Sequence, residues 1–113
     1  MPTLSLRIKF GLKGHIGPGK IELLEQIAAF GSISAGARQM SMSYKRAWEL
    51  VEEMNALFGK PVLETRKGGK RGGGAQLTAV GLAVVSRFRA VERAALAAAE
   101  PHMTALQDEI GAE

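Results

Sequence analysis

A short polar break, Ser41-Met42-Ser43, separates two amphipathic segments and constrains the fold more than any other feature of the sequence. Ser32 or Ser34 can cap a helix before the break, and Ser43 can cap a longer one after it, because serine oxygens accept hydrogen bonds from free N–H groups at helix starts. The apolar positions are Ile33, Ala37 and Met40 in the first helix, and Ala47, Leu50, Val51, Met54 and Leu57 in the second, Tyr44 to Phe58. Two short helices joined this tightly predict a helix-turn-helix unit.

The residues before this unit predict a strand, a loop and a helix. Leu4 to Phe10 alternates apolar and polar side chains with a period of two, which is typical of a half-buried strand. Gly11 to Gly19 contains four glycines and Pro18, and predicts a loop. From Lys20 onward the apolar positions recur at helical spacing, and Gly31 is placed to end this helix.

The residues after the unit predict a hairpin and a long helix. Val62 to Arg66 and Ala75 to Thr78 resemble strands, and the connector Lys67 to Gly74 contains five glycines and three basic residues. A helical pattern then runs from Ala79 to about Ala99, and Pro101 is expected to kink or restart the helix.

The order of these elements is that of a winged helix-turn-helix, a mainly α fold with a small β wing. We expect the winged unit at residues 1–79 and, within the same structural unit, a C-terminal helical segment at residues 80–113. This segment carries more apolar surface than one small domain needs to cover, so we expect it to pair two subunits. The predicted dimer interface consists of Val84, Phe88, Val91, Ala95 and Leu96.

Positive charge is concentrated in two windows of the chain. The sequence has 15 Lys and Arg against 11 Asp and Glu, with a pI near 9.8. Gln26 to Trp48 holds three basic residues and no acid, and Thr65 to Val91 holds six basic residues and no acid. Windows of this kind favour a nucleic-acid partner, because clustered cations attract phosphates.

The helix after the polar break carries the predicted base contacts in its first turn. Free N–H groups and two cations lie there, and the second helix of such a unit enters the major groove. Glu49, Glu52 and Glu53 would repel phosphate further along, so contact should stay near the start. The residues predicted to bind DNA are Ser43, Tyr44, Lys45 and Arg46 in this helix, Ser32, Ser34 and Arg38 before it, and Arg66, Lys67, Lys70 and Arg71 in the hairpin.

These assignments have structural alternatives. The two cations of the helix could form ion pairs with Glu49 and Glu53 one turn later, and capping alone explains Ser34 equally well. For Trp48, packing is favoured over DNA contact, because large aromatic side chains are usually buried. The glycine-rich basic hairpin is an independent feature, and it favours DNA.

One motif suggests an enzyme, and its context argues against one. Gly14 to Lys20 fits the G-x-x-x-x-G-K pattern of phosphate-binding loops and lies between a predicted strand and helix. The next residue is Ile21 rather than Ser or Thr, and the only aspartate is Asp108, so the usual magnesium ligands are missing. We therefore expect no catalytic residues, no cofactor and no metal site.

Cysteine usage and hydropathy indicate where the protein works. The chain has no cysteine, which excludes disulfides and thiolate metal sites and suits a reducing cytoplasm. Its apolar runs are too short to cross a bilayer, so no membrane association is expected. We expect a cytoplasmic protein.

The segment from Gly31 to Trp48, GSISAGARQMSMSYKRAW, resembles the helix-turn-helix of ModE-type molybdate-responsive transcriptional regulators. GGKRGGGA at residues 68–75 and the following Leu77-Thr78 resemble the wing of that family, which has a LysR-like winged helix. The likeness covers nearly the whole chain. Two residues depart from the pattern: Ser41 stands where a glycine is expected in the turn, and Gly36 weakens a helix in which alanine is usual.

The resemblance implies DNA binding, dimerisation through the flanking helices, and control of molybdate or metal-oxyanion transport or use. We expect a sequence-specific transcriptional regulator that binds double-stranded DNA at a palindromic operator as a homodimer. The chain reaches Glu113 without the oxyanion-binding domain of full-length members, so molybdate is not expected to bind it. The alternative is a helical protein-interaction module that binds DNA only non-specifically. Neutralising Lys70 and Arg71 would separate the two.

Overall fold

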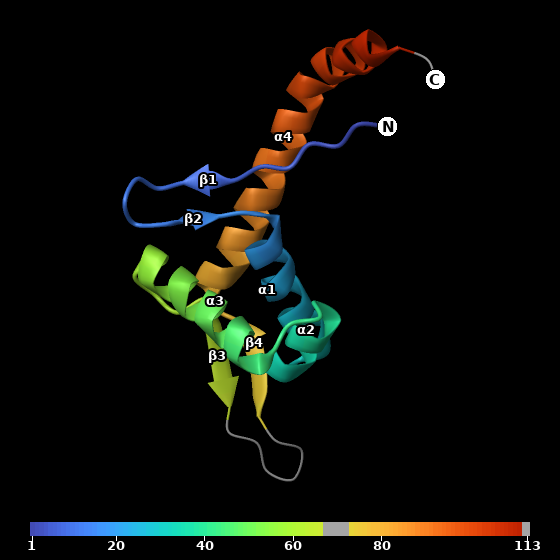
Figure 1. Cartoon of the computed structure of the whole chain (residues 1–113). Coiled ribbons are helices and arrows are strands. Elements are labelled where there is room, and N and C mark those ends of the chain that lie inside the picture. The colour runs from blue at the N-terminus through green and yellow to red at the C-terminus, as the bar shows by residue number, and fades with distance from the viewer. Residues whose placement is uncertain (67–72, 112–113) are drawn as a thin grey trace.

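The computed structural model describes residues 1–66 and 73–111, and within them a helical body carries two small hairpins (Figure 1). The β3–β4 hairpin projects from one end of the molecule and the distal half of the last helix from the other, which gives a longest dimension of 58 Å. The order of elements is β1 (Ile8–Lys9), β2 (His15–Ile16), α1 (Pro18–Phe30), α2 (Ile33–Gln39), α3 (Tyr44–Phe58), β3 (Leu63–Arg66), β4 (Gly74–Leu77) and α4 (Ala79–Ile110).

Helix α1 lies at the centre of the core and packs against α2, α3 and α4. Four of its apolar side chains, Ile21, Leu23, Leu24 and Ile27, are completely shielded from solvent. Burial of this kind contributes roughly 2 kcal/mol for each large aliphatic side chain. The core therefore fixes the helix-turn-helix unit directly against α1.

Gly36 allows α1 and α2 to approach each other closely. A Cβ atom at this position would lie 2.5 Å from Ile27 Cγ1 and 2.9 Å from the Ile27 backbone nitrogen. The sequence analysis treated this glycine only as a weak point in a helix, and that interpretation was incomplete. The missing side chain is what lets the two helices pack.

Serine side chains cap α2 and α3, as the sequence predicted. Ser32 Oγ accepts a hydrogen bond from the Ala35 N–H, and Ser43 Oγ accepts one from the Arg46 N–H, both at 3.0 Å. Between the two helices, Ser41 has a φ of 55°, a left-handed conformation that glycine adopts far more easily. The turn thus requires a left-handed residue at the position where a glycine was expected, and Ser41 adopts that conformation.

The N-terminal segment differs from its prediction. The expected strand at residues 4–10 is reduced to the two residues of β1, and the expected loop contains β2 and the start of α1. Ile8 pairs with Ile16 across an antiparallel hairpin. The turn closes through a hydrogen bond of 2.8 Å from the Phe10 N–H to the Gly14 carbonyl oxygen. The glycines of the turn made this short hairpin resemble a loop in the sequence.

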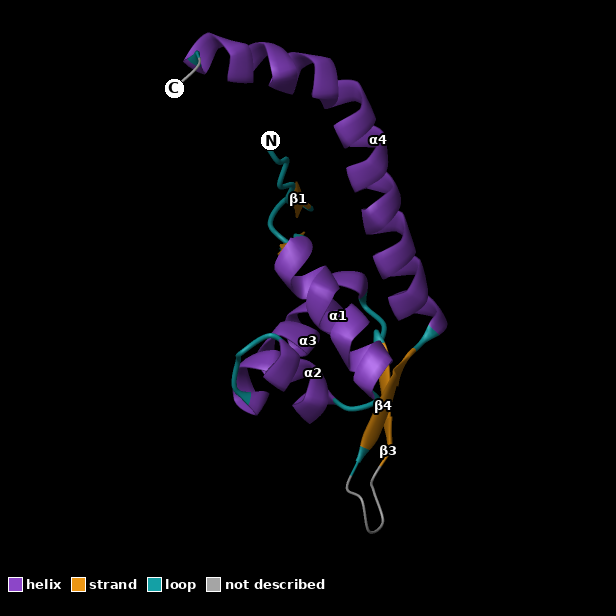
Figure 2. Cartoon of the chain, turned by 90° about the vertical axis from the view of Figure 1, so that its right-hand side faces the viewer, coloured by secondary structure: helices purple, strands orange, loops and turns teal. Residues whose placement is uncertain are grey.

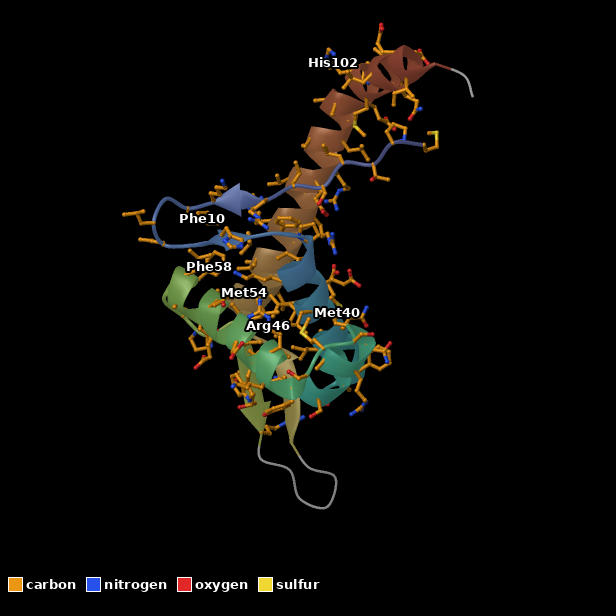
Figure 3. The ribbon with its side chains drawn as sticks, viewed as in Figure 1. Phe10, Met40, Arg46, Met54, Phe58 and His102 are labelled. Atoms are coloured by element: carbon orange, nitrogen blue, oxygen red, sulfur yellow. The ribbon has the colours of Figure 1, made fainter. Side chains whose placement is uncertain are left out.

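Aromatic packing joins this first hairpin to the end of α3. The rings of Phe10 and Phe58 meet edge to face, with their centroids 6.1 Å apart (Figure 3). Nearby, Lys20 Nζ lies 3.0 Å from the His15 carbonyl oxygen and 3.0 Å from Glu53 Oε1. These contacts hold β2, α1 and α3 together on the side of the molecule away from the wing.

The second hairpin confirms the predicted wing in its described part. Strands β3 and β4 are antiparallel, with Leu63 opposite Leu77 and Arg66 opposite Gly74. Residues 67–72, which include the predicted cations Lys67, Lys70 and Arg71, lie outside the described residues.

Helix α4 is continuous, with Pro101 inside it rather than at a break. The expected restart was therefore wrong, whereas the bend is present: α4 curves toward the N-terminal segment (Figure 2). Proline removes one helical N–H and crowds the preceding turn, which accounts for a bend without an interruption.

An ion-pair network fastens α4 to α1. Arg89 donates to Glu25 through Nε at 3.0 Å and Nη2 at 2.7 Å, and to Glu92 through Nη1 at 2.6 Å. Hydrogen bonds to the Glu25 carboxylate, and then to that of Glu92, raise the pKa of the Arg89 guanidinium above its ordinary value. Arg89 belongs to the second acid-free window, yet two carboxylates already neutralise it.

Candidate nucleic-acid interface

The first turn of α3 is open to solvent. Ser43, Tyr44, Lys45 and Arg46 are all exposed, while the opposite face of the helix is buried against the core. The helix start has no acidic residue in its first turn, so nothing there opposes a phosphate. This arrangement can present hydroxyl groups, cations and backbone N–H groups to one DNA surface.

The alternative pairing of the α3 cations is present in part. Arg46 Nη1 lies 3.4 Å from Glu49 Oε1, and both side chains are about half exposed. An exposed pair at this distance stabilises the helix only weakly. Among residues 1–66 and 73–111, no ion pair involves Lys45, and Glu53 contacts Lys20 instead.

Of the three residues predicted to bind DNA in and before α2, two are exposed and one caps the helix. Ser34 and Arg38 are exposed, whereas Ser32 is half-buried and its hydroxyl oxygen caps α2. The sequence left open which of the two serines caps the helix. The structure assigns the cap to Ser32 and leaves the Ser34 side chain at the surface.

A groove of about 480 Å³ joins the helix-turn-helix to the base of the wing. Arg66 lines it, in β3, and so does Thr65, which the sequence analysis did not single out. Its lining among the described residues is Ser32, Ile33, Ser34, Tyr44, Trp48, Thr65, Arg66, Gly73, Gly74 and Ala75. Sequence positions more than 40 residues apart thus share one concave surface, and its described residues include no acidic side chain. The strand register places Thr65 opposite Ala75, and knowledge of this pairing would have indicated that Thr65 lies at the wing base.

Trp48 combines core packing with a polar contact. Its side chain is half-buried and packs against the core, as the sequence favoured. Its indole Nε1–H also donates a hydrogen bond to the Tyr44 hydroxyl oxygen. The sequence analysis missed this contact, although the spacing of four residues on one helix permits it.

A second hollow, of about 510 Å³, lies beside the start of α1 and contains four basic side chains: Arg7, His15, Lys20 and Arg46. The Lys20 ammonium, followed by partial burial and Arg7, lowers the pKa of His15 below its ordinary value. Lys20 itself is held by the His15 carbonyl oxygen and Glu53. The segment that fits the phosphate-loop pattern therefore forms a strand and a helix start, with its lysine already bound.

Two residues of the predicted dimer interface are already covered within the chain itself. Phe88 and Val84 are buried, 1% and 9% exposed, because they pack into the core of their own chain. Val91 and Leu96 are 42% and 40% exposed, and Ala95 is half-buried. The exposed apolar surface of α4 keeps Val91 and Leu96 from the predicted set and extends further along the helix.

This surface borders a groove of about 660 Å³ between α4 and the N-terminal segment. Leu96 and Met103 line it from α4, and Leu4 and Leu6 line it from the segment before β1. Leu106 and Ile110, further along α4, are about two-thirds exposed. Within the described part of the chain, no helix is both long and apolar enough to span a membrane.

A solved structure shares this architecture. The DNA-binding domain of CbnR, seen in a crystal structure of its complex with DNA, superposes with a TM-score of 0.59, covering 77% of this chain and 94% of that one. The sequences are 22% identical over the match, so the likeness concerns the fold. The fold is a winged helix-turn-helix.

Known sequences are similar over most of the chain. The DNA-binding transcriptional dual regulator ModE of Escherichia coli is 42% identical over 83 residues, 74% of this chain and 32% of ModE. The molybdenum-pterin-binding protein MopA of Rhodobacter capsulatus is 41% identical over 80 residues, 71% of this chain and 30% of MopA. This chain resembles part of ModE. It spans about 30% of the length of these relatives, and no family model matches it.

Proposed function

We propose that this protein is a sequence-specific DNA-binding transcriptional regulator of the ModE type. The observation that carries the proposal is the groove between α3 and the wing base, where hydroxyl groups and a guanidinium from three elements converge without an acidic residue. Arg38 on α2 and Lys45 in the first turn of α3 are also exposed. Such a surface attracts the phosphates on both sides of a major groove while the start of α3 meets the bases.

The similarity to ModE and MopA supports a role in molybdenum metabolism. Regulators with a DNA-binding part like this one control genes through the operator they recognise, so we propose target genes for molybdate or oxyanion transport and use. We assign DNA recognition to residues 1–79, and we propose neither a catalytic function nor molybdate binding for this chain. Its proposed place of action is the cytoplasm.

We further propose that the protein binds a palindromic operator as a homodimer. The exposed apolar residues Val91, Leu96, Leu106 and Ile110 lie in the α4 part of residues 80–113, away from the proposed DNA face. A second copy that covered this surface would place two recognition helices on one side of the duplex. Sedimentation at micromolar concentration tests this arrangement, and a monomer would contradict it.

The main test is to capture genomic fragments with the purified protein at near-physiological salt and to sequence them, with and without molybdate. An enriched palindrome beside oxyanion-transport genes supports the proposal. The matched control is Lys60→Ala, since Lys60 is exposed beyond the opposite end of α3. Lys45→Ala should weaken capture of the enriched fragments about tenfold, and Lys60→Ala should preserve it. A change on adding molybdate would place an effector site in this chain.

The second candidate is a helical protein-interaction module that binds DNA non-specifically, and the exposed apolar residues of α4 favour it. It predicts salt-sensitive capture of fragments without a common motif. Under that outcome, Lys45→Ala would weaken capture of all fragments equally.

A further inference from the structure

The hydrogen bond between Trp48 and Tyr44 has a fixed direction. An indole N–H can only donate, so the Tyr44 hydroxyl oxygen must be the acceptor. The hydroxyl proton of Tyr44 therefore points elsewhere. Within residues 1–66 and 73–111, no hydrogen bond uses that proton. Among the described residues, the Tyr44 hydroxyl thus keeps an unused donor.

Packing fixes this donor in place. The indole of Trp48 is half-buried against the core, one turn after Tyr44 on α3. The two rings meet edge to face at a centroid distance of 6.5 Å and an interplanar angle of 84°. Tyr44, by contrast, is 51% exposed. The anchored Trp48 ring thus holds the exposed Tyr44 ring in position. Binding of a ligand by Tyr44 therefore costs little side-chain entropy.

Both rings line the groove that ends at the wing base, together with Ser34 and Arg66. We propose that Trp48 positions the Tyr44 hydroxyl to donate a hydrogen bond to a DNA phosphate oxygen held in this groove. The proposal rests on the DNA-binding function proposed above. It makes Trp48 a positioning residue and Tyr44 the contact residue.

The lining favours a phosphate over a base edge. Hydroxyl groups and arginine are the side chains that commonly contact phosphate oxygens. Among the described residues of the lining there is no asparagine or glutamine, which read adenine in a bidentate manner, and no carboxylate, which accepts from cytosine. Ser34, Tyr44 and Arg66 are all donors here, and a phosphate offers acceptors only.

The free protein provides the first test, because the chain has a single tryptophan and hence a single indole N–H resonance. In the full chain labelled with ¹⁵N, Tyr44→Phe keeps the ring and removes the acceptor oxygen. We expect the indole N–H resonance to shift upfield and its proton to exchange faster with water. An unchanged resonance and exchange rate would overturn the proposal without any use of DNA.

The second test uses a duplex that the wild-type protein selects from a random library, in versions that each carry one neutral methylphosphonate. Tyr44→Phe should weaken binding to the unmodified duplex about tenfold, as expected for a hydrogen bond to a charged group. At one methylphosphonate position, wild type and Tyr44→Phe should bind equally. A tenfold difference that persists on every version would overturn the phosphate assignment.

Substitution of Trp48 tests its positioning role. Trp48→Phe should weaken binding about threefold, and the double variant should bind no more weakly than Tyr44→Phe alone, because both changes affect one hydrogen bond. Additive losses would overturn the role of Trp48. Benzothienylalanine at position 48, which keeps the bicyclic shape and lacks the N–H, gives the same comparison if Trp48→Phe lowers the melting temperature.

Failure of the underlying function gives a different pattern. If the wild-type protein selects no preferred duplex, sequence-specific regulation is contradicted, while the indole resonance still decides the Trp48–Tyr44 contact. If it binds no DNA, the phosphate assignment falls with the function.

Discussion

Two groups of basic side chains carry the same charge and have different neighbours. In the scaffold, Arg89 and Lys20 contact carboxylates from other helices at 3.0 Å or less. In α2, α3 and β3, by contrast, Arg38, Lys45 and Arg66 have no carboxylate partner among the described residues. A cation that a carboxylate already neutralises gains little from a phosphate. The comparison teaches that partners, and not the number of cations in a sequence window, distinguish cations used by the scaffold from those proposed to bind DNA.

The largest expected effect belongs to the scaffold, at Gly81. A Cβ atom there would collide with the carbonyl oxygen of Val62 at the entrance to the wing. We expect Gly81→Ala to lower the free energy of unfolding by about 3 kcal/mol, because backbone must move to admit the methyl group. Urea denaturation measures the change. Gly19→Ala, in an open position on α1, is the control and should change stability little. Equal free energies of unfolding for the two variants would show that the backbone at the entrance to the wing moves at little cost.

The next effect belongs to the cations proposed to bind DNA. Arg38→Ala and Lys45→Ala should each weaken binding to a selected duplex about tenfold and reduce the log–log salt slope by about 0.9, if each side chain contacts one phosphate. Fluorescence anisotropy at several salt concentrations measures both quantities. The free energy of unfolding should change by less than about 0.5 kcal/mol, as is usual for exposed positions. An unchanged salt slope would remove the residue concerned from the DNA surface.

Loss of a scaffold cation should have the opposite effects, lowering stability and leaving DNA binding unchanged. Arg89→Met should lower the free energy of unfolding by about 1 kcal/mol, a modest value because the side chains of this network are partly exposed and screened by water. Affinity for DNA and its salt slope should stay the same. Thermal denaturation at low and high salt measures the loss, which should shrink as salt increases. A reduced salt slope for DNA binding would erase the distinction between the two groups.

The smallest expected effect concerns the turn that sets α3 against α2. Ser41→Gly should raise the free energy of unfolding by about 0.5 kcal/mol, since glycine adopts the left-handed backbone of this position without strain. Ser34→Gly, within α2, should do the reverse because glycine weakens helix interiors. Parallel urea titrations of the two variants compare them. If Ser41→Gly destabilised the protein, the serine side chain would have a role beyond the turn.

Local patterns predicted the elements around the helix-turn-helix well. The bounds of α3, the two serine caps and the antiparallel wing follow from capping residues, periodicity and glycine placement, all of which act over a few residues. The same reasoning failed at β2, where glycine counts suggested a loop. In a two-residue strand the alternation of side chains is too short to detect, so the pairing with β1 decides the structure.

Contacts between distant residues could not be predicted. The sequence assigned Phe88 to a dimer interface because helical periodicity shows that a face is apolar and does not show what covers it. The core of the same chain covers Phe88. The partners of Arg89, the need for Gly36 beside Ile27, and the groove at the wing base arise likewise from helices that meet only after folding. The predicted contacts with DNA and with a second subunit stay predictions.

Because α4 is continuous through Pro101, its length sets how its distal half is rotated relative to the recognition face. Because one helix runs from the wing to Ile110, each residue along it adds about 100° of rotation and 1.5 Å of translation. A single residue inserted after the Arg89 network would turn the distal half of α4 by more than a quarter of a revolution relative to the recognition face. Seven inserted residues would restore the orientation to within about 20° and move the distal half by roughly 10 Å. The length of α4 thus sets an angle as well as a distance.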